Sequence, residues 1–210
     1  MELQERILHT ADDLFRKYGV RSVTMDDLAK HLSISKKTLY QYYTDKDALV
    51  HKITDDTIRR IDRDMEMIRT ESTNALDECV RILQYMRGMI ASFQPTFLYD
   101  LQKYYPKAYN VFADYRERHI KNSILFNIRR GIKEGLYRKD VNPEIVARLR
   151  LQQIEGCMNP VMFPPSMFSM VDVAHQSLML FLHGLVTEKG FKMLEQYSSK
   201  KNLSPIIAKA

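Results

Sequence analysis

The residues best suited to chemistry in this chain are the polar side chains between Ser35 and Lys46. Within residues 30–46 the only acidic residue is Asp45, whereas lysines occur at Lys30, Lys36, Lys37 and Lys46. A lysine can donate to O6 and N7 of guanine or to a phosphate, and a threonine methyl can pack against the methyl group of thymine. The segment therefore suits a polyanionic partner, although the net charge of +6 for the whole chain does not by itself require one.

Ser35 is of a type that caps helices, and Lys36, Lys37 and Thr38 would then form the first turn of the helix that follows. We expect at least two of these three first-turn residues to contact DNA. The alternative is a capped first turn that is merely solvated. Gln41, one turn further, is a candidate reader of adenine, and a solvated glutamine is an equal alternative.

A series of short helices must position these side chains. Leu3, Ile7, Ala11, Leu14 and Tyr18 form one apolar stripe, which predicts a helix that ends at Gly19. Thr24 can cap a second helix that ends near His31, Ser35 a third over Lys36 to Tyr43, and Thr44 a fourth. Two short helices joined by a tight turn are a helix-turn-helix, whose second helix enters the major groove.

Two further features of this region concern burial and phosphate contact. Leu39 and Tyr43 lie four residues apart, so we expect both on the buried stripe of the third helix. Ser22 and Thr24, with the free amide groups at the start of the second helix, offer an anchor for a phosphate. Thr24 could instead serve only as a cap, and the two roles are compatible.

The segment Ser22 to Val50 resembles the DNA-binding domain of the TetR family of bacterial regulators. Four motif elements carry the resemblance, in order and at the family's spacing. They are Phe15 to Gly19 at the end of the first helix, Thr24 with Leu28 and Ala29 in the second, Ser35 to Tyr43 in the third, and Lys46 with Leu49 in the fourth. The segment Gly135 to Glu144 and the stretch from Gly184 to Tyr197 fit the family more loosely.

The resemblance implies roles for three more residues. Tyr40 and Tyr42 would point toward the duplex, with their hydroxyl groups on phosphates or base edges, and Lys46 would contact the phosphate backbone. Lys37 departs from the pattern, because many members of the family have a small residue there. A lysine at this position could reach a guanine edge, reach a phosphate or remain solvated.

The remainder of the chain is predicted to be helical, which makes the protein all-α with about nine or ten helices. We expect a helix-turn-helix domain over residues 1–60, with its motif at about 24–43, a helical domain over 61–198 and a frayed tail over 199–210. The expected helices after the first three are Asp45–Arg69, Leu76–Ser92, Phe97–Tyr104, Pro106–Glu134, Pro143–Gly156, Met167–Glu188 and, beyond Gly190, Phe191–Tyr197.

The resemblance implies that the C-terminal domain binds a small molecule and forms a homodimer. In the family the last two long helices pair with those of a second copy, and a two-fold dimer suits a palindromic operator. The dimer candidates are Leu149, Val171, Ala174, Leu178, Phe181 and Leu185. The candidates for an apolar cavity are Met86, Met89, Phe93, Phe97, Tyr104, Tyr105, Tyr109, Phe112 and Phe126, each of which could equally be plain core.

Several other classes of protein find no support in the sequence. The histidines show no metal-ligand spacing, there is no glycine-rich phosphate loop, and the adjacent aspartate pairs diverge on a helix, so we expect no enzyme, metal or cofactor. Cys79 and Cys157 form no redox motif, and no signal peptide or membrane span is evident, which favours a cytoplasmic protein. The resemblance implies that the protein is bacterial. A rival reading is a helical small-molecule-binding or protein-interaction module whose helix-turn-helix is only structural.

Overall fold

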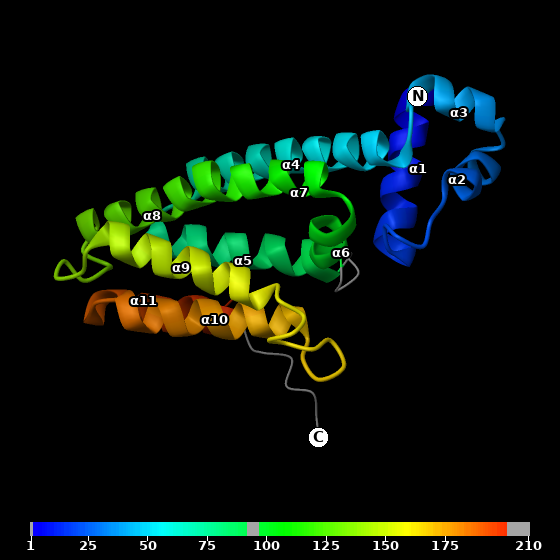
Figure 1. The fold of residues 1–210 in the computed structure, drawn as a ribbon. Coiled ribbons are helices and arrows are strands. Elements are labelled where there is room, and N and C mark those ends of the chain that lie inside the picture. The colour runs from blue at the N-terminus through cyan, green and yellow to red at the C-terminus, as the bar shows by residue number, and fades with distance from the viewer. Residues whose placement is uncertain (1, 92–96, 201–210) are drawn as a thin grey trace. The chain divides into compact units, whose positions relative to one another are not determined.

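The computed structural model describes residues 2–91 and 97–200, which are helical throughout apart from short connections (Figure 1). Within these residues the only β-type pairing is an isolated antiparallel bridge between Tyr137 and Val186. The all-α class expected from the sequence is confirmed. The helices are α1 (Leu3–Tyr18), α2 (Met25–Leu32), α3 (Lys36–Tyr42), α4 (Lys46–Glu71), α5 (Ala75–Ala91), α6 (Phe97–Tyr104), α7 (Pro106–Tyr115), α8 (Lys121–Lys133), α9 (Pro143–Cys157), α10 (Met170–Leu185) and α11 (Glu188–Lys200).

The described residues form two compact units. Unit 1 holds α1, α2, α3, the part of α4 up to Ile61, and α6 with α7. Unit 2 holds the part of α4 from Asp62, α5, and the chain from Arg116 through α11. The expected domain limits near residues 60 and 198 remain a prediction, but the sequence did not indicate that α6 and α7 group with the helix-turn-helix.

Unit 1 is built on the apolar stripe of α1. Ile7, Ala11, Leu14 and Phe15 are buried, and Gly19 adopts a φ of 85° that allows the chain to leave the helix. The stripe packs on buried residues of α2 and on Leu39 of α3. It also packs on Leu101 of α6, on Tyr105 between α6 and α7, and on Ala108 of α7. Helix α3 therefore shares one buried core with α1, with α2 and with the segment from α6 to α7.

The start of α4 differs from the expected one. The helix begins at Lys46 rather than Asp45, and its cap is Asp45 rather than Thr44, because Asp45 Oδ1 accepts from the Ala48 amide at 2.7 Å. Aspartate and threonine are both good caps, and only the path of the chain after α3 decides between them.

The long helix expected over Pro106–Glu134 has an interruption. Residues Arg116–Ile120 form a π-helical turn between α7 and α8. Such turns insert one extra residue into a helix and are frequent at functional sites. With α7, this turn and α8 taken as one rod, the described part of the chain has ten helices.

Unit 2 is a bundle in which α8 packs on α9 and α5, and α10 packs on α9 and α5. Its buried apolar core comes from the first half of α5, the second half of α10 and the segment around Leu136 and Tyr137. Tyr137 is 1% exposed, and its hydroxyl donates to Asn127 Oδ1 at 3.1 Å. Gly131 is required opposite this ring, since a Cβ there would lie 2.1 Å from a ring carbon of Tyr137.

The last two helices divide at a different point from the expected one. The sequence suggested a helix from Met167 to Glu188 and a break at Gly190, whereas α10 ends at Leu185 and α11 begins at Glu188. The chain is held extended at the break, because the Thr187 amide donates to the Leu136 carbonyl at 2.9 Å. Gly190 lies inside α11, where a Cβ would stand 2.2 Å from that same carbonyl oxygen. The glycine permits a close approach rather than a break.

Candidate nucleic-acid interface

Helix α3 is capped by Ser35, buries one face in the core and exposes a polar face to solvent. Ser35 Oγ accepts from the Thr38 amide at 3.0 Å, and the two hydroxyl groups lie 2.8 Å apart. Leu39 is 0% and Tyr43 is 6% exposed, so both lie in the core as expected. The opposite face exposes Lys37, Gln41 and two aromatic residues, Tyr40 at 46% and Tyr42 at 42%. Large aromatic side chains on an exposed short helix leave apolar surface for a partner to cover.

Lys36 and Lys37 have different surroundings. Lys36 forms an ion pair with Asp26 of α2, and its hydrogen bond to that carboxylate raises the pKa of the Lys36 ammonium. Lys37 is exposed and has no ion-pair partner within the described residues. The pair joins the two helices of the motif. Of the two lysines, Lys37 is thus the one with a free cation to offer to DNA.

The start of α2 is a complete capping box. The Thr24 amide and hydroxyl both donate to Asp27 Oδ2, at 2.9 and 2.6 Å, and the Asp27 amide donates back to Thr24 Oγ1 at 3.1 Å. These bonds hold the pKa of the Asp27 carboxyl below its usual range. The Thr24 hydroxyl hydrogen is engaged in the cap, which leaves backbone amide groups and the exposed Ser22 hydroxyl at this helix start.

Lys46 is half-buried inside unit 1. Its Nζ lies 3.4 Å from the Arg21 carbonyl oxygen, 5.6 Å from the ring centre of Tyr105 and 5.7 Å from that of Phe15. Burial lowers the pKa of the Lys46 ammonium. The side chain joins α4 to the connection before α2 and to Tyr105, which lies between α6 and α7. If Lys46 contacts a phosphate, it does so while its side chain also contacts the Arg21 carbonyl and the Tyr105 ring of its own unit.

The predicted dimer residues divide into two groups. Leu178 and Leu185, 8% and 2% exposed, belong to the core of unit 2 and are not available to a second copy. Leu149 is 60% exposed, and Val171, Ala174 and Phe181 are half-buried. The sequence analysis overlooked Ile145 at 57%, although its spacing of four from Leu149 places both on one face of α9. Leu180 of α10, which is 72% exposed, was not predicted as a dimer residue either.

The predicted cavity residues lie in several environments. Met86 and Met89 on α5 and Phe97, Tyr109 and Phe112 on α6 and α7 are half-buried. Three others have other surroundings: Tyr105 is in the core of unit 1, Tyr104 accepts from Arg21 Nη1 at 3.3 Å, and Phe126 is 46% exposed beside the Arg69 guanidinium. Phe93 lies outside the described residues.

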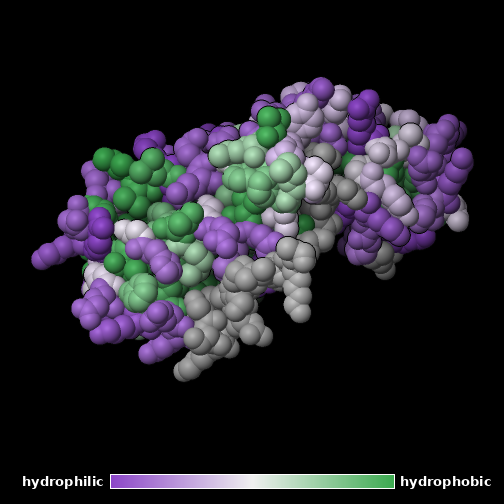
Figure 2. Space-filling view, turned by 90° about the horizontal axis from the view of Figure 1, so that it is seen from below, coloured by the Kyte–Doolittle hydropathy of each residue, from purple (hydrophilic) through white to green (hydrophobic). Residues whose placement is uncertain are grey.

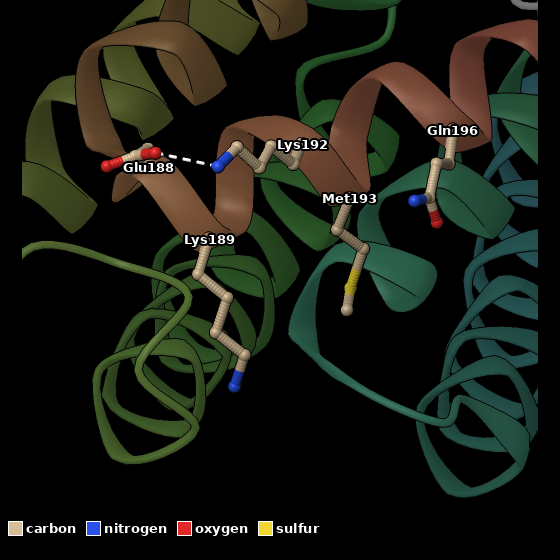
Figure 3. Close-up of a pocket in the computed structure, with 5 residues that line it drawn as sticks. All are labelled: Glu188, Lys189, Lys192, Met193 and Gln196. Atoms are coloured by element: carbon tan, nitrogen blue, oxygen red, sulfur yellow. Dashed lines mark hydrogen bonds and ion pairs between the residues drawn. The ribbon is translucent and has the colours of Figure 1, made fainter.

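A shallow pocket of about 430 Å³ lies along α11 (Figure 3). Its lining is Glu188, Lys189, Lys192, Met193 and Gln196, none of them predicted as a site residue. Figure 3 shows all five projecting from one helix, with the Lys192 ammonium turned back to Glu188 at 2.7 Å. Nothing on a second element converges on this hollow, so we assign it no role.

Membrane-spanning helices and metal-binding clusters are both absent from the described residues. No helix in the described part of the chain is long and apolar enough to cross a membrane. Residues 2–91 and 97–200 also contain no group of three or more histidine, cysteine or acidic side chains placed to hold a metal ion.

Comparison with known proteins agrees with this arrangement. The sequence profile described as "Bacterial regulatory proteins, tetR family" matches residues 7–53, which span α1 to the first part of α4. A protein of Bacillus subtilis (strain 168), described as the uncharacterised HTH-type transcriptional regulator YvaF, is 24% identical over 190 residues, covering 89% of this chain and 97% of that protein.

Solved structures of similar fold cover nearly the whole chain. A transcriptional regulator from Saccharomonospora viridis in complex with choline has a TM-score of 0.72 and 19% identity, covering 88% of this chain and 98% of its own. FadR from Bacillus subtilis in complex with stearoyl-CoA has a TM-score of 0.62 and 14% identity, covering 86% and 98%. The four motif elements and the matched profile show that residues 7–53 are a helix-turn-helix domain of the TetR family of bacterial regulators, and the solved structures show that the chain as a whole has the TetR-like fold.

Proposed function

We propose that the protein is a homodimeric repressor that binds a palindromic operator and releases it when a small molecule binds the C-terminal helices. The observation that supports DNA binding is the exposed face of α3. This helix is capped by Ser35 and held in the core by Leu39, and its exposed residues are Lys37, Tyr40, Gln41 and Tyr42. Cations and tyrosine hydroxyls can reach phosphates, and the lysine and glutamine side chains can read base edges.

DNA binding is tested by the fluorescence anisotropy of a labelled duplex taken from upstream of the protein's own gene. A scrambled duplex of the same composition is the control. We expect a Kd lower for the upstream duplex by about 10³-fold or more, and a steep dependence on salt for both. If neither duplex is bound, the helix-turn-helix is only structural and the rival reading of a binding or interaction module holds.

Residue assignments within α3 have their own test. Tyr40→Ala is expected to remove the preference for the upstream duplex while leaving salt-dependent binding to the scrambled one. Tyr18→Ala, an equally exposed tyrosine of α1 at 53%, is the matched control and should leave the preference intact. A Tyr40→Ala protein that still discriminates between the two duplexes would remove this residue from the reading surface.

Dimerisation is supported by apolar side chains that unit 2 leaves uncovered. Figure 2 shows hydrophobic patches among hydrophilic residues on one face of the molecule. Ile145, Leu149 and Leu180 are each more than half exposed on α9 and α10, an arrangement that marks interaction surfaces. A closed two-fold interface would cover the same residues on both copies.

We therefore expect Leu149→Arg and Leu180→Arg to shift the protein from dimer to monomer in a light-scattering concentration series. Met67→Arg, which alters a 53% exposed residue of α4, should leave the dimer intact. A wild-type protein that is monomeric over the whole series would contradict the proposed assembly.

Ligand-dependent release is supported by the two similar structures solved with choline and with stearoyl-CoA. A ligand changes operator affinity only to the extent that it binds the DNA-free and DNA-bound forms with different affinity.

A further inference from the structure

Helix α6 exposes tyrosine and lysine side chains on the surface of unit 1. Tyr99 and Tyr104 are 41% and 36% exposed, and Lys103, between them in the sequence, is exposed as well. Arg21, in the connection between α1 and α2, contacts Tyr104 of the same helix, and Figure 1 shows α6 next to the end of α1 where this connection begins. We call Arg21, Tyr99, Lys103 and Tyr104 the α6 patch.

Tyr104 brings two cations of the α6 patch together. The Arg21 guanidinium carbon lies 4.9 Å from the centre of the Tyr104 ring, and Arg21 Nη1 donates to the Tyr104 hydroxyl at 3.3 Å. Lys103 Nζ lies 5.4 Å from the same ring centre. An aromatic ring attracts cations placed within about 6 Å of its centre, so one ring holds both side chains. Because the two cations repel each other, an anion placed between them would stabilise this arrangement.

No carboxylate neutralises these two cations. Within the described residues neither Arg21 nor Lys103 forms an ion pair. Lys103 Nζ donates instead to the Tyr99 hydroxyl at 3.4 Å, and its hydrogen bonds to Tyr99 and then to Tyr104 raise the pKa of the Lys103 ammonium. Both partners of Lys103 are neutral phenols, so its charge remains available to a partner from outside the chain.

Two acidic residues of the same region act on another group. The pKa of the Tyr105 hydroxyl is raised by burial first, and then by the charges of Asp47 and Asp100. Neither carboxylate forms an ion pair with Arg21 or Lys103. The two cations of the α6 patch therefore have only solvent counterions, which binding to a polyanion would release.

The α6 patch is continuous with the start of α2. Arg21 directly precedes Ser22, and the Arg21 carbonyl oxygen lies 3.4 Å from Lys46 Nζ. Ser22, the free amide groups at the start of α2 and Lys46 are the phosphate contacts expected in this part of the interface. The Arg21 side chain extends from this region to Tyr104 of α6.

We infer that the α6 patch is a further phosphate-binding surface of the DNA interface. Arg21 and Lys103 each neutralise one phosphate of the duplex backbone beside the start of α2, and the Tyr99 and Tyr104 hydroxyl groups donate to phosphate oxygens. Arginine, lysine and tyrosine side chains all make such contacts with DNA. The inference rests on the proposed function, because it requires DNA binding, and it adds a helix from beyond residue 96 to an interface otherwise formed by residues 22–46.

The test is the salt dependence of binding by the full-length protein, measured as anisotropy on the upstream and the scrambled duplex. Arg21→Met and Lys103→Met are each expected to flatten the slope of log K against log salt by about 0.9, which at about 0.1 M salt is a ~8-fold higher Kd. The loss should be the same on both duplexes, because phosphate contacts carry no sequence information.

Two control variants separate phosphate binding from other effects. Lys103→Arg keeps the positive charge and should keep the wild-type slope. Lys107→Met removes the same charge from an exposed lysine of α7, in the same unit but outside the α6 patch, and should also leave the slope unaltered. Melting curves followed by circular dichroism show that each variant is folded.

Wild-type slopes in Arg21→Met and Lys103→Met, an equal loss in Lys107→Met, or a loss confined to the upstream duplex would each overturn the inference. A wild-type protein that binds both duplexes while the two patch variants keep its slope refutes only the role of the α6 patch. A wild-type protein that binds neither duplex refutes the proposed function together with this inference.

Discussion

Asp26→Asn should make the protein a tighter and more salt-sensitive DNA binder. In the structure the Asp26 carboxylate holds the Lys36 ammonium at the start of α3. Both side chains are exposed, at 45% and 61%, so the pair is screened by solvent and contributes little to folding. The substitution removes one negative charge and frees one cation at the first turn of the recognition helix.

The size of the effect follows from counterion release. If the freed Lys36 neutralises one phosphate, the slope of log K against log salt steepens by about 0.9, which at about 0.1 M salt is a ~8-fold lower Kd. The advantage should shrink ~3.5-fold between about 50 and 200 mM salt. Anisotropy on the scrambled duplex measures this directly, because the term carries no sequence information.

Two controls separate release of Lys36 from a change in net charge. Asp13→Asn makes the same change in charge on α1, where the exposed carboxylate pairs with His9, and should leave the slope unaltered. The double variant Asp26→Asn, Lys36→Ala should return to the wild-type slope. A single variant whose slope equals that of the wild type would refute the view that Asp26 withholds Lys36 from DNA.

Three other predictions concern separate parts of the molecule. Lys46→Ala should weaken binding to every duplex and flatten the salt slope by about 0.9, as measured by anisotropy; an unchanged slope would mean that Lys46 serves only its own domain. Gly190→Ala should lower the free energy of unfolding by ~1–3 kcal/mol in urea, because its Cβ would meet the Leu136 carbonyl, whereas Gly88→Ala, with open space around it, should raise it by up to ~1 kcal/mol. Burial raises the pKa of the Glu78 carboxyl above its ordinary value of 4.5, so the stability that its protonated form contributes is present below pH 4.5 and is lost as the pH rises through the folded-state pKa. Wild type should therefore lose stability relative to Glu78→Gln as the pH rises above 4.5, and a difference in the free energy of unfolding that stays constant with pH would contradict this.

The sequence by itself determined the helix-turn-helix, because the signals that specify it are local. Thr24 and Ser35 cap the helices that follow them, and the spacing of Leu39 and Tyr43 alone places both in the core. Capping and helical periodicity depend on residues only a few positions apart, so both can be predicted from the sequence. The same local signals predicted most of the later helices.

Tertiary structure decided which charges of the interface are free. Asp26 and Lys36 stand ten positions apart and meet only because the turn brings α2 against α3. Lys46 was expected to contact the phosphate backbone of DNA. Its half-buried position depends on the Arg21 carbonyl and on Tyr105, which lies between α6 and α7. No local pattern encodes such contacts, since each depends on how separate helices pack.

Packing also decided what an apolar residue or a glycine does. Leu178 and Leu149 are alike in the sequence, but one lies in the core of unit 2 and the other is 60% exposed, because a helix in a bundle buries only the stripe that its neighbours cover. Gly190 suggested a break in the chain, and the fold uses it instead for a close approach to Leu136. The sequence determines which helices form, while the neighbours of each helix determine which side chains remain for DNA, for a partner and for a ligand.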